Sequence, residues 1–137
     1  ALKTVLKLAI NYGSGPTSVP ELAKSLDIPI KFLEQILLEL KKGGFVESRR
    51  GNVGGYALSK NPSQITLGEV VRFIEGPIFP IACIREAYSG CKDSSNCIFR
   101  KIWTKVDDAT SSIIDRVDFG ELAKNSLLPK EDLVYQI

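Results

Sequence analysis

Three cysteines lie within 15 residues of one another, at Cys83, Cys91 and Cys97, in a segment otherwise rich in Gly, Ser and Asn. An odd number of thiols in a chain that opens on no secretory signal argues against a disulfide scaffold and favours a bound metal or a reactive thiol. The spacing lacks the close Cys pairs of a structural zinc site, whereas an iron–sulfur cluster takes four protein ligands, usually thiolates. A buried Cys also packs as a small hydrophobic side chain, which explains Cys97 at a helix start better than it explains all three.

The chain has no His, which removes the commonest general base and the commonest nitrogen ligand of metals. Its glycines show neither a Walker spacing nor the strand, Gly-x-Gly-x-x-Gly, helix order of a dinucleotide site. A cysteine-dependent enzyme is the remaining catalytic alternative, and it would lack a histidine base here. We therefore expect no enzymatic activity.

A second set of residues could read DNA. In a helix expected over residues 30–42, the apolar stripe that faces the core is Leu33, Ile36, Leu37 and Leu40. The residues turned outward are Lys31, Glu34, Gln35, Leu38 and Lys42. The first turn of such a helix is where base edges are met in a major groove. There Gln35 could bond adenine and Glu34 could accept a hydrogen bond from cytosine N4. For an isolated helix, an ordinary solvated face explains the same pattern.

Arg49 and Arg50 end an expected strand beside the glycine-rich turn at residues 51–55. Alternating side chains before and after this turn predict a β-hairpin. Used as a wing, such a hairpin can follow the phosphate backbone or place an arginine in a narrow minor groove. Read as structure alone, Gly51, Gly54 and Gly55 supply the positive φ of a turn.

Apolar periodicity and capping signals predict the elements that must position these residues. Helices are expected over residues 1–12, from a cap at Thr17 or Ser18 to Asp27, and over residues 30–42, the last two joined by a short turn as in a helix-turn-helix. After the hairpin, the capping box Thr66-x-x-Glu69 opens another helix.

The longest helix is expected over residues 98–117, and Asp118 and Glu121 cap a last short helix. The long helix carries a heptad-like apolar seam of the kind that one helix shows to a partner helix. Its members are Phe99, Ile102, Val106, Ala109 and Ile113. The seam predicts a homodimer. The expected fold class is mainly α with a small β-hairpin wing, a winged helix-turn-helix followed by a long dimerisation helix.

Length and composition agree with this class. The 137 residues, 44% hydrophobic and 25% charged, suit one compact globular domain. Residues 1–60 hold 9 Lys and Arg against 5 Asp and Glu, a net +4, and residues 61–137 hold 9 against 11, a net −2. A modestly basic first half permits binding to nucleic acid without proving it. No apolar run approaches the length of a membrane span, so we expect a cytoplasmic protein without membrane contact. Because the chain starts inside a helical pattern without Met, further N-terminal residues are expected to precede it.

These motifs together resemble the Rrf-type winged-helix repressors, the bacterial family that includes IscR, NsrR and CymR. The resemblance covers nearly the whole chain and is carried by Phe32 to Leu37, Gly44 to Val46, Arg50-Gly51-x-x-Gly54-Gly55-Tyr56-x-Leu58, Ile65 to Val71, Glu75 to Pro77, the three cysteines and Trp103. It implies a homodimer that binds a palindromic operator in double-stranded DNA, with the long helix crossing to the partner. By similarity, Lys31, Glu34 and Gln35 match base-contacting positions, and Arg50 matches a wing arginine in the minor groove.

The resemblance also implies a use for the cysteines, because three cysteines in this loop hold a 2Fe–2S or 4Fe–4S cluster in the cluster-binding members. This chain departs from that pattern in two ways. Arg100 stands where IscR-like members place a His ligand, and seven residues separate the first two cysteines where five are more usual. Other members take the fourth ligand from an acidic residue near the N-terminus.

We therefore expect a winged helix-turn-helix domain at residues 1–75, a cysteine-bearing sensor loop at 76–97, and a dimerisation helix with a short C-terminal helix at 98–137. The expected function is sequence-specific DNA binding by a transcriptional repressor controlled through an iron–sulfur cluster on Cys83, Cys91 and Cys97. The alternative is a cluster-free member that senses oxidants by thiol chemistry or responds to a regulatory partner enzyme. The residues expected to contact DNA are Lys31, Phe32, Glu34, Gln35, Arg49, Arg50, Gly51, Asn52, Gly54, Gly55 and Tyr56.

Overall fold

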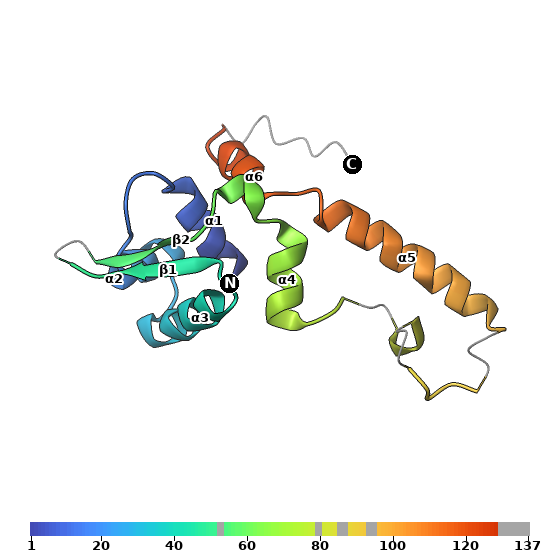
Figure 1. Ribbon diagram of the computed structural model, residues 1–137. Coiled ribbons are helices and arrows are strands. Elements are labelled where there is room, and N and C mark those ends of the chain that lie inside the picture. Colours follow the sequence, from blue (N-terminus) through green and yellow to red (C-terminus); the bar gives the residue numbers. More distant parts are fainter. Residues whose placement is uncertain (52–53, 79–80, 85–87, 93–95, 129–137) are drawn as a thin grey trace.

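The computed structural model describes residues 1–51, 54–78, 81–84, 88–92 and 96–128 (Figure 1). Within them the elements run in the order α1 (Leu2–Ile10), α2 (Val19–Leu26), α3 (Ile30–Lys42), β1 (Val46–Arg49), β2 (Gly55–Leu58), η1 (Pro62–Gln64), α4 (Leu67–Glu75), η2 (Ala82–Ile84), α5 (Ile98–Ile114) and α6 (Phe119–Ser126). This is the expected mainly helical fold with a two-stranded antiparallel hairpin.

Helices α2 and α3 are packed together as a helix-turn-helix. Ser18 caps α2 by accepting a hydrogen bond from the Glu21 backbone N–H, and Asp27 ends the helix in the left-handed region with φ 53°. Helix α3 then begins after Pro29 and buries one leucine every three or four residues. Leu33, Leu37 and Leu40 are completely buried, so the orientation of α3 is set by its apolar stripe.

The hairpin pairs Val46 with Leu58 and Arg49 with Gly55. It is extended by a short bridge in which the N–H and C=O groups of Thr17 and Tyr56 exchange two hydrogen bonds of 2.9 Å. Because a Cβ at Gly55 would clash with the Thr17 carbonyl, Gly55 serves this close backbone approach. The expectation that three glycines supply positive φ is therefore wrong for two of them, since only Gly51 has a positive φ, at 135°.

Helix α4 begins with the expected capping box, in which Thr66 and Glu69 each bond the backbone of the other. The long helix α5 ends at Ile114, three residues before its predicted end. The reason is long-range pairing, because the Val117 carbonyl accepts a hydrogen bond of 2.8 Å from the Leu67 N–H and Asp118 forms a β-bridge with Thr66. An extended backbone at these positions cannot continue the helix.

Helix α6 begins at its expected cap, Asp118, and returns the chain to the start of the fold. It packs against α1 and η1, and Phe119 is only 1% exposed within the core that also holds Val5 and Leu22. The short helix thus follows the long one in sequence but lies on the winged-helix part. The expected division into residues 1–75, 76–97 and 98–137 remains a prediction. The packing of α6 on α1 and η1 shows that the last of these segments contacts the first.

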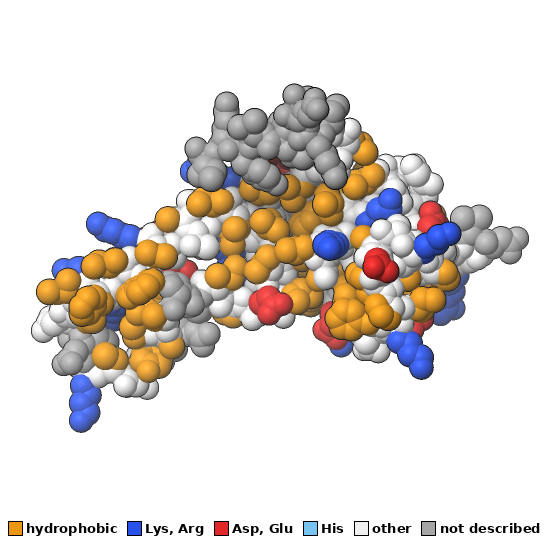
Figure 2. Space-filling model, turned by 180° about the vertical axis from the view of Figure 1, so that it is seen from behind, with side chains coloured by type: hydrophobic (Ala, Val, Ile, Leu, Met, Phe, Trp, Pro, Cys, Tyr) orange, Lys and Arg blue, Asp and Glu red, His pale blue; other side chains and the backbone are white. Residues whose placement is uncertain are grey.

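Helix α5 projects away from the winged-helix part, on the side opposite to that toward which strands β1 and β2 extend (Figure 1). All five seam residues of α5 are exposed, with Phe99 at 69% and Ile113 at 63%. Figure 2 shows hydrophobic side chains gathered at the end of the molecule that α5 and the neighbouring loop form. Among the described residues, no helix is long and apolar enough to cross a membrane.

Candidate functional site

The outer face of α3 carries four exposed residues in helical register, Lys31, Glu34, Gln35 and Leu38. They lie within about 100° of one another around a helix that turns 100° per residue, opposite the buried leucines. This face is uncovered in the described chain. Its amide, carboxylate and ammonium groups are the types that hydrogen-bond base edges and phosphates.

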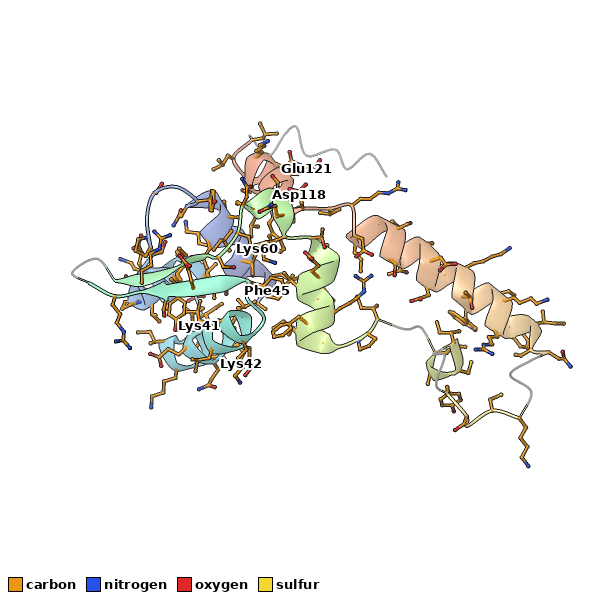
Figure 3. All side chains as sticks on the ribbon, viewed as in Figure 1. Lys41, Lys42, Phe45, Lys60, Asp118 and Glu121 are labelled. Carbon is orange, nitrogen blue, oxygen red and sulfur yellow. The ribbon has the colours of Figure 1, made fainter. Side chains whose placement is uncertain are left out.

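The two lysines at the other end of α3 are already engaged (Figure 3). Lys41 Nζ lies 2.7 Å from the Ser48 hydroxyl, and Lys42 Nζ lies 2.7 Å from the Glu39 carboxylate. The polar groups without such partners in the described structure are therefore concentrated in the first two turns of the helix.

Phe32 departs from this face. It is 62% exposed, but helical geometry places it at the edge toward Ile28 and Ile36, and with them it lines an apolar groove that α4 closes through Val71 and Ile74. The structure thus brings Phe32 beside the expected reading face rather than into its centre.

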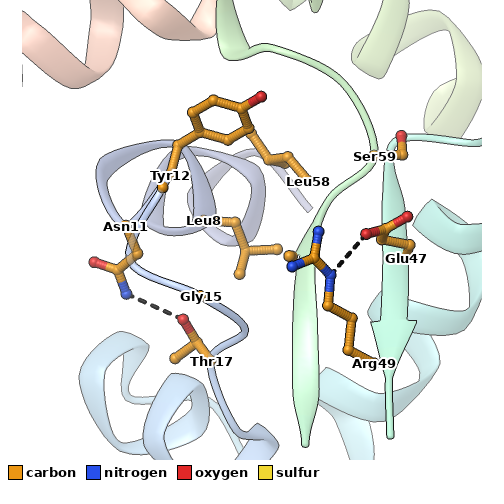
Figure 4. Close-up of a pocket in the computed structure, with 11 residues that line it drawn as sticks. Leu8, Asn11, Tyr12, Gly15, Thr17, Glu47, Arg49, Leu58 and Ser59 are labelled. Atoms are coloured by element: carbon orange, nitrogen blue, oxygen red, sulfur yellow. Dashed lines mark hydrogen bonds and ion pairs between the residues drawn. The ribbon is translucent and has the colours of Figure 1, made fainter.

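On the wing, Arg49 and Arg50 have different surroundings. Arg49 Nε donates to the Glu47 carboxylate over 2.9 Å, and both residues line a hollow bounded by Tyr12 and Thr17 from the segment between α1 and α2 (Figure 4). Arg50 is exposed and has no ion pair within the described residues. Of the two arginines, Arg50 is the one available to a phosphate or to a minor groove.

The remaining wing residues divide in the same way. Gly51 is exposed with positive φ, whereas Gly54, Gly55 and Tyr56 are half-buried beside the Thr17 bridge. They pack closely beside the turn, and their expected contacts with DNA remain predictions. Asn52 lies outside the described residues, so its expected DNA contact remains a prediction.

The three cysteines are all free and half-buried. Cys83 lies in η2, which contacts α5, and Cys97 is the residue before the first turn of α5, so both belong to neighbouring elements. Even so, no group of three Cys, His, Asp or Glu within the described ranges is arranged to hold a metal ion. Within the described residues the three thiols are therefore not gathered into a ligand group, and they could supply only three of the four usual ligands of a cluster.

One polar site was not anticipated from the sequence. Arg72 of α4 forms a bidentate ion pair with Asp115 at the end of α5, with Nη1 to Oδ1 at 2.6 Å and Nη2 to Oδ2 at 3.0 Å, and Nη2 lies 3.1 Å from the Ser111 hydroxyl. This hydrogen bonding lowers the pKa of Asp115 and raises the pKa of Arg72. An Arg and an Asp separated by 43 residues carry no pairing signal in one sequence.

A helix-turn-helix with an uncovered polar face on its second helix, followed by a hairpin bearing an exposed arginine, defines a winged-helix DNA-binding protein. Comparison with known proteins agrees. The model of the Rrf2 family, described as iron-dependent transcriptional regulator, matches residues 1–125. The chain belongs to the Rrf2 family of transcriptional regulators, not to an enzyme family, as the sequence motifs had indicated.

Relatives and solved structures place the chain near two kinds of regulator. It is 32% identical over 122 residues to the HTH-type transcriptional regulator CymR of Bacillus subtilis, covering 89% of this chain and 83% of CymR. It is 30% identical over 125 residues to IscR of Cronobacter sakazakii, covering 91% of this chain and 76% of IscR. The structure of B. subtilis CymR, the global cysteine regulator, matches with a TM-score of 0.74 over 90% of both chains at 32% identity. That of IscR from T. potens matches with 0.72 over 91% of this chain and 81% of the other at 26% identity.

Proposed function

We propose that this protein is a sequence-specific repressor that binds a palindromic operator in double-stranded DNA as a homodimer. The observation that carries the proposal is the face formed by Lys31, Glu34 and Gln35, exposed on a helix whose opposite side is held by three fully buried leucines. Rigid support matters because base reading needs side chains held in one geometry. Arg50 on the wing adds a charge that can approach the backbone or the minor groove.

The operator is found by selecting duplexes from a randomised library with the purified protein. We expect the selected duplex to contain two inverted half-sites and to bind with at least ~10³-fold higher affinity than a scrambled duplex at the same salt concentration. Equal affinity for selected and scrambled duplexes would overturn sequence-specific binding. A single unpaired half-site would contradict the homodimer on DNA.

For the finer control we propose that Cys83, Cys91 and Cys97 regulate operator binding by holding an iron–sulfur cluster. Three thiols in one loop next to the start of α5 support this, as does the similarity to IscR. Because the thiols do not form a ligand group as described, cluster binding would require them to move together. The fourth ligand must be something other than His, since the chain contains none.

The alternative is a cluster-free regulator that responds to thiol oxidation or to a partner enzyme, and the similarity to CymR supports it equally. Protein purified without oxygen separates the two. A cluster requires visible absorbance with stoichiometric iron and acid-labile sulfide, all lost in Cys91→Ser. Wild-type protein could instead contain neither iron nor sulfide after reconstitution. If Cys91→Ser then still changes operator affinity, the protein is regulated by thiol oxidation or by a partner enzyme and not by a cluster.

A further inference from the structure

Helix α5 is attached to the winged-helix part by few contacts. None of its residues is buried in the described chain, and the elements it touches include α4 and η2. The direction in which α5 leaves the winged-helix part therefore depends on a small number of interactions near its C-terminal end.

One of these interactions is the fork that Arg72 forms with α5. One guanidinium bonds both carboxylate oxygens of Asp115 and the hydroxyl of Ser111, one turn earlier on α5. A bidentate fork defines the plane and the direction of the two groups as well as their separation. It therefore restrains rotation of α5 about the end of the helix.

Gly68 packs against the same ion pair. It lies one turn before Arg72 on the same face of α4 and is buried. A Cβ at this position would clash with Asp115 Oδ1 and lie 2.7 Å from Arg72 Nη1. Its φ is not positive, so the backbone conformation does not require glycine. An added methyl group would instead require the ends of the Asp115 and Arg72 side chains to move.

Backbone pairing anchors the residues that follow. The Leu67 N–H donates to the Val117 carbonyl over 2.8 Å, and the Phe119 N–H donates to the Ile65 carbonyl over 3.0 Å. With this point held, α5 acts as a lever about 25 Å long, given its 17 residues and a rise of ~1.5 Å per residue. A rotation of ~10° at the anchored end would move the far end by ~4 Å, which is about one base-pair step.

We propose that Arg72, Asp115 and Gly68 form a clamp that sets the angle of α5 relative to the winged-helix part, and thereby the operator half-site spacing that the dimer accepts. The inference rests on the proposed dimeric DNA binding. Arg72 is a positioning residue in this arrangement. It does not contact DNA. By setting the angle of α5, the proposed dimer helix, it sets the distance between the α3 helices of the two protomers.

The test uses the duplex selected by the wild-type protein and two derivatives in which the distance between half-sites is one base pair shorter or longer. Each base pair changes the separation by ~3.4 Å and the relative orientation by ~35°. Affinities are measured for the wild type, Arg72→Lys, Gly68→Ala and Arg116→Ala. Arg72→Lys keeps the charge without the fork, Gly68→Ala displaces the carboxylate, and Arg116→Ala removes an exposed arginine next to Asp115.

For Arg72→Lys and Gly68→Ala we expect the preference for the selected spacing to fall about fivefold, the scale of a partly exposed ion pair worth up to ~1 kcal/mol. Binding to scrambled duplex should stay unchanged, because phosphate contacts do not depend on half-site spacing. Arg116→Ala should retain the wild-type spacing profile.

Equal losses on every duplex, or an unchanged spacing profile in both folded variants, would overturn the clamp. A wild-type protein that tolerates all three spacings equally would also overturn it, while leaving sequence-specific binding intact. Failure of the proposed function looks different, since then no duplex is selected at all. Thermal unfolding identifies a variant that has lost its fold, and Arg72→Lys is chosen because it leaves the packing of Gly68 untouched.

Discussion

Arg49 and Arg50 are neighbours in sequence, but only Arg49 is paired with Glu47. We expect Arg50→Ala to weaken operator binding and to reduce the slope of log K against log salt by about one phosphate contact. If Arg50 enters a minor groove, the substitution should also relax an A·T preference at one position. Arg49→Ala is the matched comparison and should cost less affinity. Salt titrations on selected and scrambled duplexes measure both, and an unchanged Arg50→Ala protein would make the wing purely structural.

Glu34 is an acidic side chain on the face proposed to meet a polyanion. It lowers affinity unless it accepts a hydrogen bond from a cytosine amine or repels other bases. Glu34→Ala should therefore shift the discrimination between sites with and without the matching cytosine by ~1–3 kcal/mol. Glu39→Ala, a second exposed acid on α3 that pairs with Lys42, is the control. Equal changes on all duplexes in the Glu34 variant would contradict base reading.

Asp115 gives a pH dependence with a defined sign. Its pKa is lowered by the hydrogen bonds from Arg72, so the folded state binds fewer protons than the unfolded state between the two pKa values. The contribution to stability is present above the unfolded pKa of ~3.9 and is lost as the pH falls through the lowered value. The difference between the free energies of unfolding of wild type and Asp115→Asn should stay constant from neutral pH down to about 4. Below about pH 4 the two values should converge. Curves for wild type and Asp115→Asn that stay parallel below about pH 4 would contradict the pair.

At the scale of elements, the packing of α3 depends on a narrow apolar stripe, and neighbouring leucines in the sequence lie on and off that stripe. Leu37 is completely buried, whereas Leu38 is 46% exposed. Leu37→Ala should lower the free energy of unfolding by ~2–5 kcal/mol, because it removes transfer energy and leaves a cavity. Leu38→Ala should change it by less than ~0.5 kcal/mol. Denaturant titrations decide this, and equal losses would show that the helix is rotated relative to the orientation described.

At the scale of the whole molecule, the exposed seam of α5 predicts a partner helix. A charge on the seam should be incompatible with a buried interface, so Ile102→Glu should convert a dimer into a monomer at micromolar concentration. Thr104→Glu adds the same charge on the opposite side of α5 and should stay dimeric. Sedimentation velocity distinguishes the two. A wild-type monomer, or a dimer unaffected by Ile102→Glu, would place the interface elsewhere.

The sequence alone determined the class of fold and its family. Helix periods, the Thr66 to Glu69 capping box, the turn at Asp27 and the arginine-glycine wing are local signals, because each depends on residues a few positions apart. Residues 30–42 were predicted as a helix and α3 spans Ile30–Lys42. The outward face of α3 followed from the same periodicity.

Tertiary structure alone decided where distant segments meet. The early end of α5, the packing of α6 on α1, the Thr17 bridge that requires Gly55, and the Arg72 to Asp115 pair all join residues far apart in the chain. Such contacts leave no periodic or capping signal, since any exposed arginine or aspartate looks alike before the chain folds. The placement of the three cysteines belongs here too. Their spacing along the chain was visible, but whether the thiols converge depends on how the loop packs against α5, which no local rule specifies.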